Sequence, residues 1–178
     1  MNLEKYQQYS RIARGLEKAD LVLKDARIVN VFTEEIIRGD IAIQDGIIAG
    51  IGSFHGKEER DLAGRYVCPG FIDSHLHLES TLVTPAELVT AASRHGTTTF
   101  IVDPHESANV SGLAGIDYIL DQTEDVKANV YVMMPSCVPA TAIDDNGCTL
   151  TAEDMAPYLH NSRILGLGEV MDSISVVQ

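Results

Sequence analysis

Tryptophan is absent from this 178-residue sequence, aromatic residues make up only 6% of it, and cysteine occurs three times. Cys68, Cys137 and Cys148 form no CxxC pair and are odd in number, so we expect reduced thiols rather than a disulfide framework. No apolar run approaches the length of a membrane span, and the N-terminus lacks the hydrophobic core of a signal peptide. We therefore expect a cytoplasmic protein without a membrane partner.

Basic side chains are scarce: 13 lysines and arginines stand against 26 aspartates and glutamates, for a formal net charge of −13. A chain this acidic repels nucleic-acid phosphates and anionic membrane surfaces, so we expect neither as a partner. The remaining composition is that of an ordinary globular protein, with 45% hydrophobic residues and a mean hydropathy of +0.03. Its length is enough for one domain with a proper core. Charge alone does not identify a substrate.

In the N-terminal third of the chain, the spacing of apolar residues changes once, from a helical to a strand-like pattern. Residues 1–19 predict a short amphipathic helix, because apolar residues recur every three or four positions. Short β-rich runs then follow at 21–23, 28–32 and 41–43. Asp45-Gly46, between two apolar residues, is a strong signal for a hairpin turn. The charged run 57–61 indicates a solvated loop, and the neighbouring His55 a surface residue.

Beyond this region the sequence alternates between strand-like and helical segments. Four apolar strands are predicted, with starts near positions 72, 99, 130 and 164. These starts recur about every 30 residues, the length of a strand-helix-strand unit. Such regular alternation predicts parallel strands joined by right-handed helical crossovers.

Three helices are expected between these strands. Thr84 and Glu87 form a capping box, with Pro85 at the first helical position, for a helix that runs to about His95. The second helix carries its apolar residues on one side, at positions 113, 116, 119 and 120. Thr151 and Asp154 can cap a short third helix.

The stretch 67–82, VCPGFIDSHLHLESTL, is the most informative part of the sequence. Successive side chains on a strand alternate between faces, so His75 and His77 point the same way. Two imidazoles on one face at a strand end make a bidentate seat for a divalent metal. Asp73 shares that face and could accept a hydrogen bond from the ring N–H of a metal-bound histidine. The alternative is two histidines on an exposed strand end.

The string PGFIDSHLH resembles the first-strand signature of the amidohydrolase superfamily, metal-dependent hydrolases built on a (β/α)8 barrel. HLHLES, DPHE, SCVPA and GLGEVMD follow in the order typical of the bacterial adenine deaminase branch. The resemblance implies an α/β protein in which residues 67–178 form the first four βα units of the barrel. It also implies that 1–66 contribute a helix and a small β-sandwich segment. We expect the chain to reach half way round the barrel.

The same resemblance implies a reaction: adenine and water give hypoxanthine and ammonia, as in purine salvage. It implies a binuclear centre of divalent manganese, iron or zinc that activates the attacking water, with adenine as the small-molecule partner. It also implies a homo-oligomer. Composition selects none of these.

Reactive groups in such barrels lie at the C-terminal ends of the strands. The resemblance assigns His75, His77 and Glu169 to the metals, Glu169 also being the catalytic residue. The candidate substrate contacts are Glu79, His105 and Glu106. Alternatively, these side chains form hydrogen bonds to the metal-binding residues or are carboxylates at the start of a helix. We interpret Ser136 and Cys137 as loop structure, because no base is placed to activate either. His55, His95 and His160 are expected to have no metal role.

Two other interpretations remain open at this point. The chain could come from another amidohydrolase, such as a deacetylase acting on an N-acyl sugar. It could also be a non-catalytic fragment. For the chain on its own, no residue after the fourth strand completes the ligand set that the resemblance implies, so we expect it to be inactive. Four parallel strands without neighbours also leave an unpaired sheet edge, so we expect it to self-associate.

Overall fold

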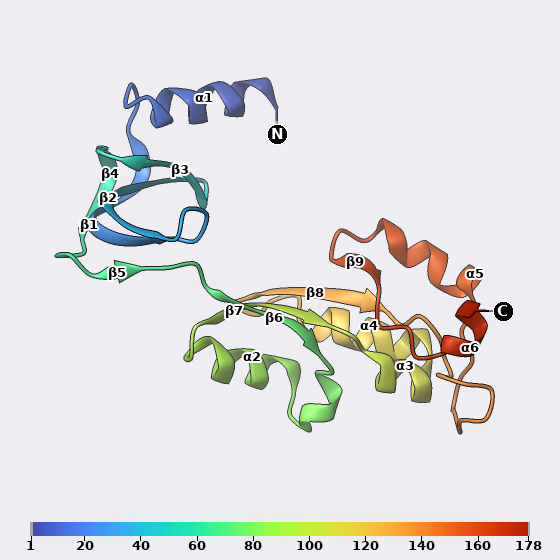
Figure 1. Ribbon diagram of the computed structural model, residues 1–178. Helices are drawn as coiled ribbons and strands as arrows, with labels where there is room; N and C mark the ends of the chain where they lie inside the picture. The colour runs from blue at the N-terminus through green and yellow to red at the C-terminus, as the bar shows by residue number, and fades with distance from the viewer. Residues whose placement is uncertain (1, 178) are drawn as a thin grey trace. The chain divides into compact units, whose positions relative to one another are not determined.

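A computed structural model describes residues 2–177, except for the side chain of Ser175. The chain divides into two compact units, Met1–Pro69 and Gly70–Gln178, and each is described by itself (Figure 1). Within residues 2–177, no helix combines the length and the apolar character needed to cross a bilayer.

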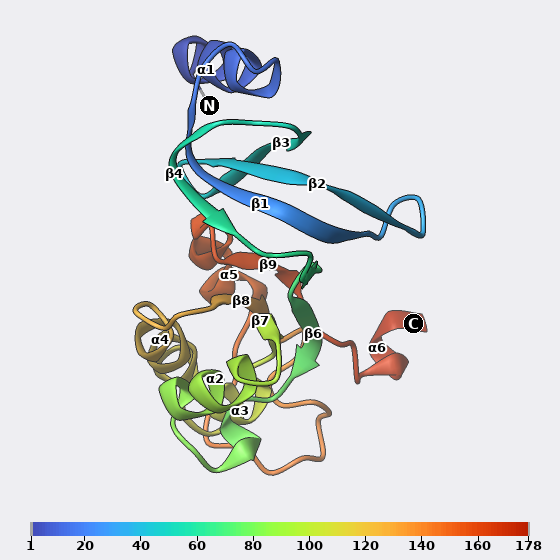
Figure 2. The same ribbon diagram turned by 90° about the vertical axis from the view of Figure 1, so that its left-hand side faces the viewer.

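The first unit consists of one helix and one five-stranded sheet. The helix α1 spans Leu3–Ala13, and the strands are β1 (Ala19–Asn30), β2 (Glu35–Gln44), β3 (Ile47–Gly52), β4 (Gly56–Asp61) and β5 (Tyr66–Val67). The sheet order is β3-β2-β1-β4, with β5 also paired to β1. The long ribbons of β1 and β2 are antiparallel and are plainly seen in Figure 2.

The structure corrects three sequence-based expectations in this unit. The helix ends at Ala13 rather than near residue 19, because Gly15 adopts a φ of +71° that a right-handed helix cannot contain. The runs 21–23 and 28–32 belong largely to the single strand β1, which ends at Asn30. The charged run 57–61 is a strand, β4, because its backbone pairs with β1 in parallel while its side chains stay exposed.

The hairpin expectation is confirmed. Asp45 and Gly46 both have positive φ and join β2 to β3, which pair antiparallel from Gln44 and Ile47 outward. The β-sandwich stays a prediction, because a sandwich needs two facing sheets and the described part of this unit forms one.

The second unit is a parallel α/β structure. Its strands are β6 (Phe71–Leu76), β7 (Thr97–Val102), β8 (Asn129–Met134) and β9 (Ile164–Leu167). They pair in the order β6-β7-β8-β9, every pair parallel, which confirms the predicted strand-helix alternation. The C-terminal ends of the four strands therefore meet at one edge of the sheet.

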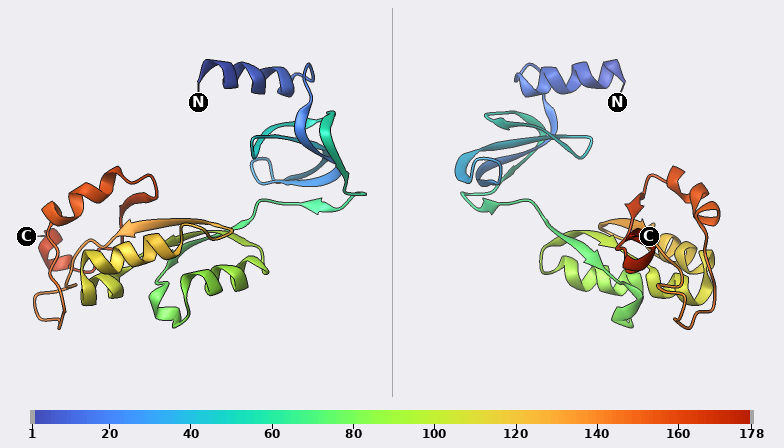
Figure 3. Two further views of the ribbon diagram at one scale, coloured as in Figure 1. Left: turned by 180° about the vertical axis from the view of Figure 1, so that it is seen from behind. Right: turned by 45° about the vertical axis from the view of Figure 1, so that its right-hand side comes forward.

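Helices connect these strands. They are α2 (Pro85–Ser93), α3 (His105–Ser111), α4 (Leu113–Gln122) and α5 (Ala152–Met155), with 3-10 turns η1 (Glu79–Thr81) and η2 (Ala156–His160). A further helix, α6 (Ser173–Val177), follows β9. Helices α2, α3 and α4 lie along one face of the sheet, as the view from behind also shows (Figure 3). The apolar core forms there, around Val89 of α2, Phe100 of β7, Ile116 and Ile119 of α4 and Val132 of β8.

The observed helices differ in some details from those predicted from the sequence. The expected second helix is confirmed as α4, and a further helix, α3, precedes it; Gly112, with a φ of +62°, separates the two. Thr84 makes no side-chain bond to the first turn of α2, so the expected capping box is wrong; Pro85 remains as the start signal. The capping box of Thr151 and Asp154 is confirmed at α5.

Candidate metal centre

His75 and His77 lie at the C-terminal end of β6, where reactive groups are expected in a parallel α/β fold. His75 is the last residue but one of the strand, and His77 is the first residue beyond it. Their ring centroids are 5.0 Å apart and the ring planes meet at 83°. The alternation argument thus places the two imidazoles side by side.

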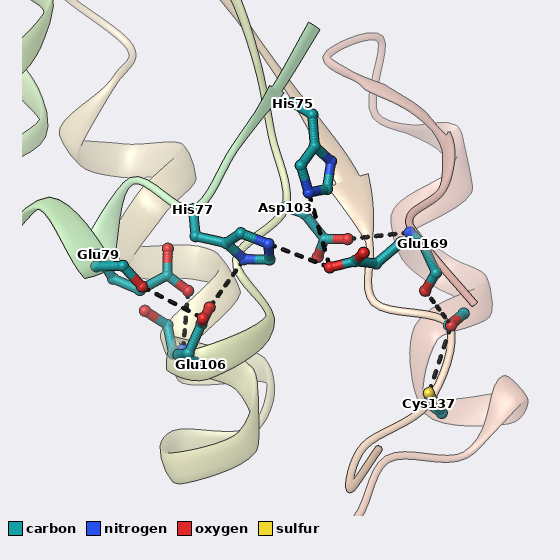
Figure 4. A network of polar contacts seen from close by, with 10 residues as sticks. His75, His77, Glu79, Asp103, Glu106, Cys137 and Glu169 are labelled. Atoms are coloured by element: carbon teal, nitrogen blue, oxygen red, sulfur yellow. Dashed lines mark hydrogen bonds and ion pairs between the residues drawn. The ribbon is translucent and has the colours of Figure 1, made fainter. Parts of the chain in front are cut away.

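Glu169, two residues beyond the end of β9, meets both histidines (Figure 4). Its Oε1 lies 3.2 Å from Nε2 of His77 and 3.7 Å from Nε2 of His75. One ligand atom from each of the three residues falls within 4.8 Å of the other two. Two neutral imidazole nitrogens and a carboxylate oxygen are donors that zinc, iron and manganese accept. The donor set therefore fits the divalent metal that the sequence led us to expect.

Glu106 approaches His77 from the opposite side of its ring. Nδ1 of His77 lies 2.9 Å from Oε2 of Glu106, an ion-pair contact without the alignment of a hydrogen bond. Burial favours the neutral imidazole, yet the negative charges of Glu106 and Asp103 outweigh it and raise the pKa of His77. A carboxylate behind a histidine also leaves its other ring nitrogen free to face a metal.

Glu79 and Glu106 form a second acidic group with His77. Oε1 of Glu79 accepts the backbone N–H of Ser107 at 3.0 Å, and Oε1 of Glu106 accepts from the Ser80 hydroxyl at 3.2 Å. Burial raises the pKa of Glu79. Burial opposes ionisation of Glu106 as well, but a hydrogen bond from its own backbone N–H and the charge of His77 lower its pKa. Of the two carboxyls, Glu79 is the one held closer to its protonated form.

His105 is not part of either group of ligand atoms among the described residues. It is the first residue of α3 and lines a hollow with Glu106, Asn109 and Asp145. Its position next to the centre follows from the end of β7, but its ring joins neither group of candidate ligand atoms among the described residues.

Asp73 does not act as expected. Its Oδ1 accepts the backbone N–H of His75 at 3.4 Å, rather than an imidazole N–H. A short carboxylate reaches the main chain two residues on more readily than a neighbouring side chain on the same strand. The remaining histidines lie elsewhere: His55 contacts Glu59, His95 follows α2, and His160 ends η2.

The sequence interpretation missed two residues that contact Glu169. Asp103 follows β7 and is only 1% exposed, and its Oδ2 accepts the backbone N–H of Glu169 at 3.2 Å. Ser136, interpreted as loop structure, follows β8 and donates its hydroxyl to the carbonyl oxygen of Glu169 at 2.6 Å. Their position at strand ends was the signal for both: Asp103 is the first residue after β7, and Ser136 is the second after β8.

Comparison with known proteins identifies the family. Residues 66–170 match the model of the amidohydrolase family. The chain belongs to this family. The resemblance carried by PGFIDSHLH is thereby confirmed, and both His75 and His77 fall inside the matched amidohydrolase region.

Two relatives show how much of an amidohydrolase this chain spans. An adenine deaminase of Desulfitobacterium hafniense (strain Y51) is 58% identical over 177 residues, which cover 99% of this chain and 31% of that protein. An adenine deaminase of Geobacillus kaustophilus (strain HTA426) is 51% identical over 155 residues, 87% of this chain and 27% of its own length. The chain therefore spans about a third of the length of these relatives.

A solved structure supports the fold. The N-acyl-D-glutamate deacylase of Bordetella bronchiseptica, complexed with zinc and a phosphonate inhibitor, matches 79% of this chain and 34% of its own with a TM-score of 0.55. At 21% sequence identity, this likeness concerns the fold alone.

Proposed function

We propose that this chain is part of an adenine deaminase, which converts adenine and water to hypoxanthine and ammonia. The observation that carries the proposal is the convergence of His75, His77 and Glu169 in a chain 58% identical, over almost its whole length, to a protein named adenine deaminase. The setting we propose is purine salvage in the cytoplasm.

The proposed centre is binuclear and holds manganese, iron or zinc. When bound, such ions act as Lewis acids and make water a nucleophile near neutral pH. His75 and His77, which present Nε2 toward Oε1 of Glu169, would hold the metal together with that carboxylate. Its negative charge offsets part of the charge of two dications, which is the catalytic role we assign to it.

Glu79, Glu106 and His105 are proposed substrate contacts. Adenine presents N–H donors and ring-nitrogen acceptors along its edges, so it needs partners of both kinds. Burial raises the pKa of Glu79, so of the two it is the better placed to share a proton with a ring nitrogen, whereas the lowered pKa of Glu106 suits it to accept from an N–H. His105 lines a hollow together with Glu106 and is half-buried there.

The architecture we propose is the first half of a (β/α)8 barrel in residues 67–178, preceded by a helix and a β-sandwich segment in 1–66. The four parallel strands and the helices on one face support this. We propose adenine as the small-molecule partner, a homo-oligomer as the assembly, and no nucleic-acid or membrane partner.

An N-acyl sugar deacetylase is the alternative within the same family. The relatives at 58% and 51% identity are named adenine deaminases, so the alternative is not favoured. The likeness to the Bordetella deacylase supports no substrate, because it concerns the fold alone.

A direct assay separates the two activities. The complete gene product, loaded with manganese, zinc or iron, is incubated with adenine and with N-acetylglucosamine 6-phosphate as a representative N-acyl sugar. We expect ammonia from adenine, together with hypoxanthine in equal amount, and no acetate. Acetate release without ammonia would replace this proposal with the alternative.

A further inference from the structure

Side chains from two neighbouring strand ends bond the backbone of Glu169 on both sides. Oδ2 of Asp103 accepts its N–H at 3.2 Å, and Oγ of Ser136 donates to its carbonyl at 2.6 Å. Glu169 itself lies beyond the last residue of β9, Leu167, where the ladder to β8 has ended. The last backbone bond between these segments runs from the N–H of Gly168 to the carbonyl oxygen of Met134 at 2.7 Å, so the two side chains hold the residue that comes next. Figure 4 shows Asp103 beside Glu169.

Asp103 is built into the fold rather than laid on its surface. It is 1% exposed, and its own N–H donates to the carbonyl of Leu76 at 2.9 Å, between the two candidate metal-binding histidines. A side chain at position 168 would collide with Oδ2 of Asp103, so the contact needs Gly168. Asp103 thus connects the end of β6 to the segment that carries Glu169.

This placement leaves the other carboxylate oxygen of Asp103, Oδ1, buried and without a hydrogen-bond partner among the described residues. Leaving a buried acceptor unpaired destabilises a fold. A carboxylate retained under those conditions points to a task beyond packing.

We propose that Asp103 and Ser136 are positioning residues, which hold the main chain of Glu169 so that its carboxylate faces His75 and His77. The inference rests on the proposed metal centre. A long glutamate side chain on an unpaired backbone samples many arrangements, and a fixed backbone removes most of them before any ligand arrives. The gain is a carboxylate already within 3.2 Å of one imidazole nitrogen and 3.7 Å of the other.

Cobalt is a suitable probe, because its visible d–d absorption reports the geometry of its ligands and does not require turnover. The complete gene product is loaded with Co²⁺, and both the spectrum and the rate of cobalt loss to a chelator are recorded. Ser136→Ala removes one bond to Glu169, and Asp103→Ala removes the other. We expect each variant to alter the spectrum and to lose cobalt about 10- to 100-fold faster, the usual effect of removing a partner behind a ligand.

Conservative replacements provide the rescue. Ser136→Thr keeps the hydroxyl and Asp103→Asn keeps an acceptor oxygen, so both should lie closer to the wild type than the alanine variants do. The matched control is Thr123→Val, since Thr123 makes a similar 2.6 Å bond to the carbonyl of Ile119, within α4. That variant should leave the cobalt spectrum unchanged even where its melting temperature falls.

The outcomes are distinguishable. Unchanged cobalt spectra and release rates in Ser136→Ala and in folded Asp103→Ala would overturn the positioning role; Ser136→Ala decides alone if the buried variant does not fold. A wild type that binds no cobalt would overturn both this inference and the metal centre. A wild type that binds cobalt but releases no ammonia from adenine would overturn the proposed reaction and leave the positioning result standing.

Discussion

Nε2 of His77 and Oε1 of Glu169 lie 3.2 Å apart, although 92 positions separate the two residues in the chain. Two strands, β7 and β8, lie between β6 and β9 in the sheet, so the contact forms across their ends. Parallel pairing makes this possible, because it brings all four C-terminal strand ends to one edge. Ligands from distant parts of the sequence can then meet at a single centre.

Glu169→Gln in the complete gene product should impair metal binding far more than folding. The amide keeps the shape of the side chain but removes its charge and makes a poor ligand for two dications. We expect metal affinity to fall at least about 10- to 100-fold, with a larger loss of turnover. Metal content after dialysis and ammonia release from adenine measure the two effects.

The control for this variant is the set of histidines outside the centre. His55→Gln, His95→Gln and His160→Gln should each leave metal content unchanged, because these residues lie in other parts of the fold. Full metal stoichiometry and near-normal turnover in Glu169→Gln would make Glu169 structural. Loss of metal in any of the three histidine variants would overturn their assignment.

Glu106→Gln should lower the pKa of His77 in the metal-free protein. Burial by itself lowers this pKa, and the charge of Glu106 is the largest of the effects that raise it. Protonated His77 therefore stabilises the metal-free fold at pH values below its unfolded pKa, and that contribution is lost as the pH rises through the folded pKa. The variant should weaken this stabilisation.

An NMR titration of the His77 ring measures the shift directly. Glu87→Gln is a matched control, since Glu87 is likewise in the first turn of a helix. A pKa of His77 that stays constant or rises in Glu106→Gln would contradict the electrostatic account.

Arg163→Ala should destabilise the second unit by about 2 to 3 kcal/mol, the range for losing hydrogen bonds to a charged group. Its guanidinium donates to the carbonyls of Val130 at 3.1 Å and Leu120 at 2.8 Å, and also to the hydroxyl of Thr123. These bonds join the end of α4 to β8. Urea denaturation followed by circular dichroism measures the change.

The comparison for Arg163 is another arginine in the same unit. Arg94 is exposed at the C-cap of α2, so Arg94→Ala should stay within about 0.5 kcal/mol of the wild type. Equal stability losses in the two variants would show that the bonds of Arg163 contribute nothing specific.

Much of the centre was predictable, because it follows from the alternation of side chains along a strand and from the parallel arrangement of the strands. Alternation along a strand pairs His75 with His77, and parallel topology brings Glu169 to the same edge. Asp103 was not selected, since an aspartate before Pro104 has the sequence appearance of an ordinary turn residue. Its role depends on its burial and on its close approach to Gly168, and both of these become apparent only in the folded structure.

The fold of the second unit was easier to predict than that of the first. Apolar runs of buried parallel strands stand out from the helices between them. The strand β4 has no such signal, because Lys57 to Asp61 are all charged and exposed, and only backbone pairing with β1 makes them a strand. Sequence patterns report side-chain burial, so a strand without buried side chains escapes them.

The 178-residue chain on its own should self-associate and should not deaminate adenine at an enzymatic rate. The outer strands of the four-stranded sheet carry exposed apolar side chains: Phe71 and Ile72 on β6 are 64% and 63% exposed, and Leu165 and Leu167 on β9 are 51% and 59% exposed. Unpaired strand edges with such residues are templates for association. At the centre, the His75 side chain is 52% exposed, so water is not excluded and charge stabilisation is weak.

Light scattering at micromolar concentration tests the association, and an adenine assay with added manganese, zinc or iron tests the activity. Leu165→Lys places a charge on the β9 edge and should shift the chain toward the monomer, because lysine blocks edge-to-edge pairing. Val110→Lys changes a residue that is 68% exposed on α3, away from any strand edge, and should leave association unchanged. Sustained turnover by a monomeric chain would mean that the catalytic unit is smaller than half a barrel. Equal effects of the two lysine variants would show that association does not run through the edge of the sheet.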